Sequence, residues 1–481
     1  MAHQLFQLGM VVLHAWISRW QVRFNSRIGD QTLAKATIQV SLKTGLRDNL
    51  ILIALWTACS LFATSAAPIE AGPLPADGLN APEVIPDEKE DYTAGLLALP
   101  EQTEALNLYC KTVDLTILRR FKNLKRLDIG GPDDYISSKA MDTLTTLPIE
   151  SMFVRADRMD ASVPAVIGRF KSLKHLALIS HWKEVPLKKL ANITDLEGLH
   201  LEAPVVGSIA DLAKCKKLRY LRIANAGAKT ETLKSDDSVM RGISRVPQLQ
   251  ELCVTLSTLS RPVLQEICSL PNLRSLDVSA MNLTDDDMKI IGQTATLEKL
   301  NLRDNPITDA GVRHLTSLKN LRALRLTNTA ISDAAFADLG NLTKLEELDV
   351  MGTKTNGSGL PKLQDLKQLR NLTLSAVVNR NLEPLKNFAT LEYLDLRAAT
   401  LSGNGAKFVA EAPKLRVLRV GRFDTDRAIR QLRSAPSLES AFSETPVIKG
   451  ERAELPALKT TKDTTELLIG DRHDIRDWTC F

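Results

Sequence analysis

The sequence predicts an α/β solenoid, in which a parallel sheet lines the concave face and helices cover the convex face. Two observations predict it. A leucine pattern recurs at a nearly constant interval, and within each interval the apolar residues change from alternating to helical spacing. The 481 residues are 44% hydrophobic and 25% charged, which is typical of a globular chain and excludes wholesale disorder.

The motif L-x-x-L-x-L recurs from Leu106 onward. The intervals between successive central residues range from 21 to 31 and average 24, and five successive intervals are 24. One unit of this length cannot bury its own apolar face, so the recurrence predicts a stacked array. The central residues are Leu106, Leu127, Met152, Leu176, Leu199, Leu221, Leu252, Leu276, Leu300, Leu324, Leu348, Leu372, Leu394 and Leu418.

Each unit contains a strand and a helix. The alternating Leu-x-Leu core of the motif predicts a short strand with one buried face. The segments between strands, such as DAGVRHLTSLKNL, have helical spacing, and Thr284, Thr308 and Ser332 are placed to cap the helix starts. Because helices are wider than strands, stacking should curve the array with the strands on the inside.

The most regular units resemble the leucine-rich-repeat family, and in particular bacterial arrays with the 24-residue unit L-x-x-L-x-L-x-x-T/N-x-I-T-D-A-G. Asn305-Pro-Ile307-Thr-Asp-Ala-Gly311 carries this pattern, and residues 329–335 repeat it. The resemblance covers roughly residues 100–440. It implies a leucine-rich-repeat solenoid, a horseshoe that binds ligands, usually proteins, on its concave face. The position after the strand is Asn or Thr in only some repeats, so we expect the outer repeats to be less regular.

Residues 1–94 precede the predicted repeats. Residues 1–48 hold six basic and two acidic residues, which fits a mis-assigned start, a cytoplasmic tail or an organelle transit sequence. Residues 49–67 are uncharged and fit a signal peptide cleaved after Ser65 or Ala66, or an uncleaved membrane anchor. Residues 68–94 hold five prolines and seven acids against one lysine, which predicts an extended linker.

The repeat domain is predicted to span residues 95–443, with about 14–15 repeats. The long interval between Leu221 and Leu252 carries a polar insert near 226–242, which is either a surface loop or a partner contact. Leu438 to Phe442 reads as a degenerate last repeat. Residues 444–481 leave the pattern and are predicted to cap the open end of the core.

Charge and motifs exclude several function classes. The formal charge is +5, but without residues 1–48 the chain has 56 basic and 55 acidic residues, which argues against a nucleic-acid groove. The six cysteines form no C-x-x-C pair and are predicted to be free thiols, with a Cys253–Cys268 disulfide as the alternative. No catalytic or phosphate-binding motif is present. We therefore predict no enzyme, no cofactor and no metal site, and membrane contact only through residues 49–67 if they stay uncleaved.

Four bulky side chains form the candidate site. Residues that flank each central leucine should face the concave side, and Phe153, His175, His200 and Tyr220 fall on four adjacent strands, which lie about 4.8 Å apart. Aromatic and imidazole groups on an exposed sheet favour a hot spot for a protein ligand. Alternatively, Phe153 lies in a weak repeat whose register is shifted.

These observations together predict an exported protein, periplasmic, extracellular or membrane-anchored at the cell envelope. It would act as a non-catalytic protein-binding or scaffold module. The alternative is an intracellular adaptor, similar to F-box leucine-rich-repeat proteins that present substrates for ubiquitination. Only Leu99-Pro100-Glu101 resembles an F-box, and the repeats begin too soon after it to leave room for one.

Overall fold

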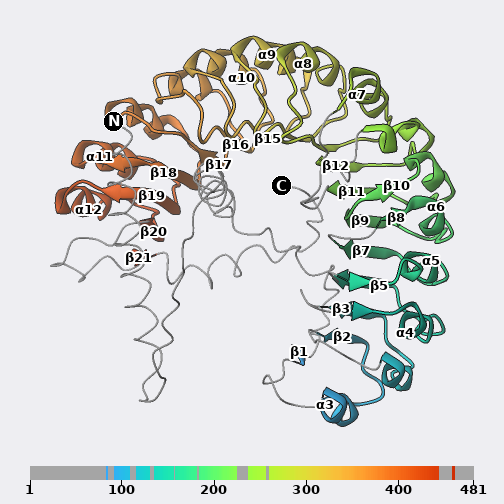
Figure 1. The fold of residues 1–481 in the computed structure, drawn as a ribbon. Helices are drawn as coiled ribbons and strands as arrows, with labels where there is room; N and C mark the ends of the chain where they lie inside the picture. The colour runs from blue at the N-terminus through green and yellow to red at the C-terminus, as the bar shows by residue number, and fades with distance from the viewer. Residues whose placement is uncertain are drawn as a thin grey trace, which may run out of the picture. The chain divides into compact units, whose positions relative to one another are not determined.

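The computed structural model describes residues 83–84, 92–108, 115–130, 135–155, 158–180, 184–224, 237–255, 259–443 and 458–460. All of them belong to the second of the two units into which the chain divides, Ala71–Phe481. Within these residues the main sheet has 17 strands (Figure 1). Each strand between β1 and β21 pairs in parallel with the strands before and after it in this sheet, and these two end strands have one neighbour each.

The strands of the main sheet are short, as one strand per 24-residue repeat requires. Two small parallel pairs lie beside them, β4 (Tyr135–Ile136) with β6 (Arg158–Met159) and β8 (Val185–Pro186) with β10 (Val205–Val206). The main strands are β1 (Glu83–Val84), β2 (Ala105–Leu108), β3 (Arg126–Ile129), β5 (Ser151–Arg155), β7 (His175–Ile179), β9 (Gly198–Glu202), β11 (Tyr220–Ala224), β12 (Glu251–Thr255), β13 (Ser275–Asp277), β14 (Lys299–Asn301), β15 (Ala323–Arg325), β16 (Glu347–Asp349), β17 (Asn371–Thr373), β18 (Tyr393–Leu401), β19 (Val417–Phe423), β20 (Ser440–Ser443) and β21 (Leu458–Thr460).

The helices lie on the outer side of the curved repeat stack and the strands on its inner side (Figure 1). The α-helices are α3 (Tyr92–Ala98), α4 (Ser138–Asp142), α5 (Val163–Ile167), α6 (Leu187–Leu190), α7 (Arg261–Cys268), α8 (Asp285–Ile291), α9 (Asp309–Arg313), α10 (Phe336–Leu339), α11 (Gly403–Ala410) and α12 (Asp426–Leu432). Other repeats replace the α-helix by a 3₁₀ helix, at Leu115–Arg120, Ile209–Lys214, Asp237–Met240, Ile243–Arg245, Leu360–Leu363 and Asn379–Asn387. Shorter 3₁₀ turns adjoin α9 and α10, at His314–Ser317 and Asp333–Ala335.

The central leucines are in register along the sheet, which confirms the predicted fold class. Leu300 pairs with Leu276 on one side and with Leu324 on the other, and the same register holds from Leu106 to Leu418. The side chains of Leu300 and Leu324 are fully buried. One continuous leucine core therefore runs between the sheet and the helices.

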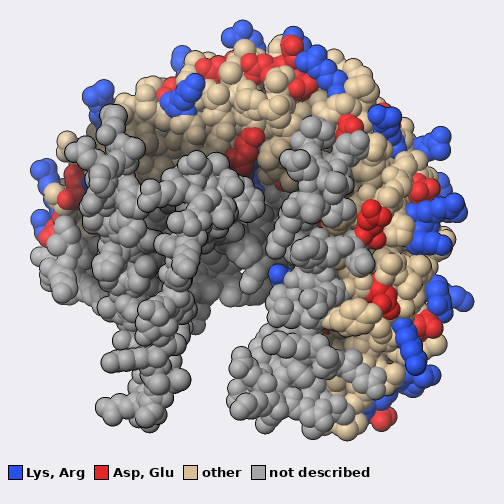
Figure 2. All heavy atoms as spheres, in the orientation of Figure 1, with Lys and Arg blue, Asp and Glu red and all other residues tan. Residues whose placement is uncertain are grey.

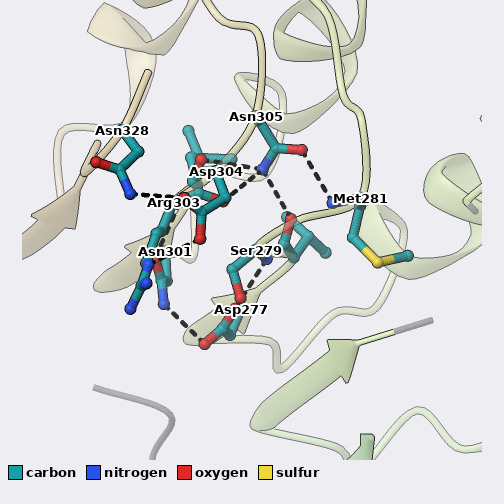
Figure 3. A network of polar contacts seen from close by, with 10 residues as sticks. Asp277, Ser279, Met281, Asn301, Arg303, Asp304, Asn305 and Asn328 are labelled. Carbon is teal, nitrogen blue, oxygen red and sulfur yellow. Dashed lines mark hydrogen bonds and ion pairs between the residues drawn. The ribbon is translucent and has the colours of Figure 1, made fainter. Parts of the chain in front are cut away.

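An asparagine joins two repeats at the turn after β14 (Figure 3). The side-chain oxygen of Asn305 accepts hydrogen bonds from the backbone N–H groups of Met281 and Leu283, at 3.1 and 2.8 Å. Its side-chain nitrogen donates to the carbonyls of Val278 at 3.0 Å and Leu302 at 2.9 Å. The asparagine thus satisfies buried backbone groups of its own repeat and of the one before.

The predicted helix caps are confirmed. Thr284, Thr308 and Ser332 are the N-cap residues of α8, α9 and the 3₁₀ turn Asp333–Ala335. The aspartate that follows each cap reaches into the next repeat. Asp309, for example, accepts hydrogen bonds from the backbone N–H and the hydroxyl of Ser332, both at 2.7 Å.

Both ends of the described array differ from the simplest reading of the sequence. The first repeats are regular, because β2, β3 and β5 keep the common register. β1 and the start of α3 lie inside residues 68–94, where the sequence predicts a linker, and β1 pairs with β2. β20 lies at the expected degenerate last repeat and pairs with β19, and β21, within residues 444–481, pairs with β20.

The segments 1–48 and 49–67 lie outside the described residues, as does most of the polar insert. In the described ranges, no helix is long and apolar enough to cross a membrane. Cys215 and Cys268 are free thiols, as predicted, so the alternative Cys253–Cys268 disulfide is not formed. The prediction of a free thiol is wrong for Cys253, which is disulfide-bonded.

Candidate functional site

The four predicted site residues lie on four neighbouring strands, β5, β7, β9 and β11. Phe153 pairs with Ala177, and Ala177 pairs with His200. Two positions earlier along the strands, Gly198 pairs with His175 on one side and with Tyr220 on the other. The alternative that Phe153 sits in a shifted register is wrong, because its neighbour Met152 pairs with Leu176 in the common register and is fully buried.

On β5 and β7, the face of the sheet opposite the leucine core carries three apolar side chains, Phe153, Ala177 and Ile179, which we call the apolar floor. Phe153, Ala177 and Ile179 form a small hydrophobic cluster of their own, separate from the main core. Strand alternation explains the separation, because residues two positions apart share one face and their neighbours share the other. The three residues are themselves buried, with 9%, 1% and 7% of their surface exposed.

His200 is a neutral imidazole at physiological pH. Burial and, to a smaller extent, the charge of Arg222 on the next strand lower its pKa to about 3. Only 7% of the residue is exposed. Its Nε2 atom lies 4.0 Å from a carboxylate oxygen of Glu202. We therefore expect His200 to act as a hydrogen-bonding group and not as a cation.

Gly198 allows His175 to lie close to the sheet. A β-carbon at position 198 would lie only 2.9 Å from Nδ1 of His175, so the imidazole occupies space that any other residue would need. Sequence analysis missed Gly198, and the signal that could have found it is a glycine at the first position of a strand, where glycine is unfavourable. Arg222 was expected on the concave face but not in the site, and it lies directly beside His200.

A polar group borders the apolar floor on the side of β2 and β3. Nη2 of Arg126 lies 2.9 Å from Oδ2 of Asp128, and the two side chains are only 11% and 8% exposed. Burial raises the pKa of Asp128, although the hydrogen bond from Arg126 opposes this effect. Asn107 pairs with Asp128, and Ser151 pairs with Arg126, so these four side chains share one face of three adjacent strands.

The polar residues of the later strands bond to one another. Asn301 donates to Asp277 at 2.8 Å, an arrangement seen in Figure 3. Arg325 pairs with Glu347 at 3.1 Å, and a further pair on β18 joins Arg397 to Asp395 at 2.8 Å. These groups already have partners within the sheet and so have less hydrogen-bonding capacity left for a ligand.

No geometry for metal binding is found in the part of the chain that the structure describes. None of its His, Cys, Asp and Glu side chains form a group of three or more that could hold a metal ion. Lys and Arg side chains are dispersed along the helix-bearing side, with Asp and Glu between them (Figure 2). No large surface of a single charge is visible in that view.

The family described as Leucine Rich repeat matches residues 295–316, the segment that contains β14 and α9. No curated protein sequence matches the chain.

Several solved structures are similar to the chain. An internalin from Listeria monocytogenes is 17% identical with a TM-score of 0.42, over 72% of this chain and 92% of the other. A leucine-rich-repeat protein from Leptospira interrogans is 18% identical with a TM-score of 0.47, over 70% and 90%. The ectodomain of the Arabidopsis receptor kinase HAESA, in complex with a peptide hormone, is 16% identical with a TM-score of 0.39, over 74% and 69%.

Proposed function

The chain is a leucine-rich-repeat protein, and we propose that it is a non-catalytic binding module of the cell envelope that holds a protein ligand on its concave face. The contact surface is the aromatic patch, defined as Phe153, His175, His200 and Tyr220. The observation that carries this proposal is the apolar cluster of Phe153, Ala177 and Ile179 on the face opposite the core.

The chemistry of the aromatic patch suits a protein surface. A buried aromatic anchor surrounded by groups that hydrogen-bond is the usual composition of an interface hot spot. The neutral imidazole of His200 supplies such a group beside Ala177 of the apolar floor, and Tyr220 supplies another on the next strand. Envelope location rests on the uncharged segment 49–67 with basic residues before it.

Affinity capture with the full-length chain tests the proposal. Proteins from the envelope fraction of the native host would be captured on the immobilised chain and on Tyr220→Ala and His200→Ala variants. We expect each variant to bind the captured partner at least about tenfold more weakly, which corresponds to 1.4 kcal/mol. The melting temperature should not fall, because these side chains lie outside the leucine core.

The matched control is Thr373→Ala on β17, which faces the same side of the sheet at the other end of the array. It should leave binding unchanged. If Thr373→Ala weakened binding more than Tyr220→Ala did, the ligand would sit on the late strands and the proposed patch would be wrong. A partner that binds all four proteins equally would also contradict the proposal.

A further inference from the structure

The four polar side chains beside the aromatic patch retain unused hydrogen-bonding capacity. Among the described residues, no partner is found for Oδ1 of Asn107, Nε of Arg126, Oδ1 of Asp128 or Oγ of Ser151, although each atom is buried. A buried polar atom without a hydrogen bond costs about 1–3 kcal/mol. Four such atoms lie on three adjacent strands, β2, β3 and β5.

The four residues share one face of the sheet on neighbouring strands. The register sets Asn107 beside Asp128 and Arg126 beside Ser151, and neighbouring strands lie about 4.8 Å apart. The bond between Arg126 and Asp128 holds their side chains together. The next residue along this face is Phe153, which pairs with Asp128 and begins the apolar floor.

We propose that Asn107, Arg126, Asp128 and Ser151 form an amide subsite, which takes the side-chain carboxamide of an Asn or Gln residue on the protein ligand. This inference rests on the proposed function, because it names the chemistry that the concave face recognises. The ligand residue lies with its carboxamide on the amide subsite and its flanking side chains on the apolar floor.

The donor and acceptor count selects a carboxamide. Two acceptors, Oδ1 of Asn107 and Oδ1 of Asp128, require two N–H donors, and Nε of Arg126 requires one acceptor. A carboxamide has two N–H groups and one carbonyl oxygen. The hydroxyl of Ser151 can donate or accept, so it bonds to whichever atom the carboxamide leaves free.

Other side-chain groups fit this count less well. A carboxylate has no donor, and it would place a second negative charge beside Asp128. An ammonium or guanidinium group has no acceptor for Nε of Arg126, and the charge of Asp128 is already balanced by Arg126. A Ser or Thr hydroxyl has one donor where two are needed.

Selection of peptides by the intact chain tests the inference. Random twelve-residue peptides displayed on phage would be selected on the full-length chain, on Asn107→Leu and on Asn371→Leu. We expect Asn or Gln to be enriched at least about threefold at one position in peptides selected by the original chain. The enrichment should disappear with Asn107→Leu. It should persist with the matched control Asn371→Leu, which makes the same change on the exposed β17 residue.

A synthetic copy of a selected peptide gives the second measurement. Replacing its preferred glutamine by glutamate should weaken binding at least about tenfold, because the carboxylate lacks donors and meets Asp128. Asn107→Leu should leave the melting temperature of the chain unchanged or raise it, because an apolar side chain removes an unsatisfied polar group. A lower melting temperature would assign Asn107 a purely structural role.

Two results would overturn the amide subsite: peptides without an Asn or Gln preference, or a preference that survives Asn107→Leu. The proposed function has its own test in partner capture through Tyr220 and His200. If binding of the partner depends on those two residues but is unchanged by Asn107→Leu, the proposed binding surface stands and only the amide subsite is refuted.

Discussion

Asn305 should contribute more to stability than any single threonine at the same position of another repeat. Its side chain is only 2% exposed and bonds to backbone groups of two repeats. Thr329, one repeat later, makes a single bond from its hydroxyl to the carbonyl of Leu326 at 2.7 Å. The substitution Asn305→Thr therefore replaces a side chain that joins two repeats by one that serves only its own.

The expected cost follows from the bonds lost. A threonine at position 305 can still bond to Leu302, as Thr329 does to Leu326, but it removes the acceptor of the Met281 and Leu283 N–H groups. Each buried N–H group that loses its acceptor costs about 1–3 kcal/mol, so Asn305→Thr should destabilise by about 2–6 kcal/mol. Thr329→Val removes one bond at constant shape and should cost about 0.5–1.5 kcal/mol.

Urea unfolding of the full-length chain, followed by circular dichroism, measures both variants. The dependence of the unfolding free energy on urea should stay the same in all three proteins, because the surface exposed on unfolding does not change. A cost for Asn305→Thr that is no larger than that of Thr329→Val would refute the reasoning. The link between repeats would then lie in the leucine core alone.

Two further predictions concern His200 and export. Burial gives His200 a pKa of about 3 in the folded chain against 6.5 in the unfolded chain. Below pH 6.5 the unfolded chain binds the extra proton, so stability falls as the pH falls. The loss should be about 2 kcal/mol between pH 7.5 and pH 5, and it should be absent in His200→Gln. If the two proteins lose the same stability in acid, His200 is not desolvated. A reporter enzyme fused after residue 94 should be active outside the cytoplasm, and activity confined to the cytoplasm would favour the intracellular adaptor.

The sequence predicted the regular repeats because their features are local. The leucine interval set the register of the sheet, and the caps at Thr284, Thr308 and Ser332 follow from side-chain preferences within one turn. It also placed Phe153, His175, His200 and Tyr220 on one face, because strand alternation needs only the position of the central leucine. None of these predictions required knowledge of a side-chain conformation.

The rest depended on contacts that spacing does not encode. A charge pair such as Arg126 with Asp128 gives no sign in the sequence that their remaining atoms stay unbonded. The pKa of His200 depends on the depth at which its strand lies and on Arg222 from another repeat. β1 was missed because two residues of an acidic, proline-rich segment carry no strand pattern.

The two parts of the concave face differ in how their polar groups are satisfied, and this difference supports the proposed binding surface. On the later strands, Asp277 bonds to Asn301 and Arg325 bonds to Glu347, so these polar groups are paired within the sheet. On β2, β3 and β5 the polar atoms keep unused capacity beside an apolar cluster that the core does not need. Folding alone would favour the first arrangement everywhere, because an unsatisfied buried atom only destabilises. We propose that a ligand completes the surface that departs from it on adjacent strands, which is why the proposed site lies on the early strands and not on the later ones.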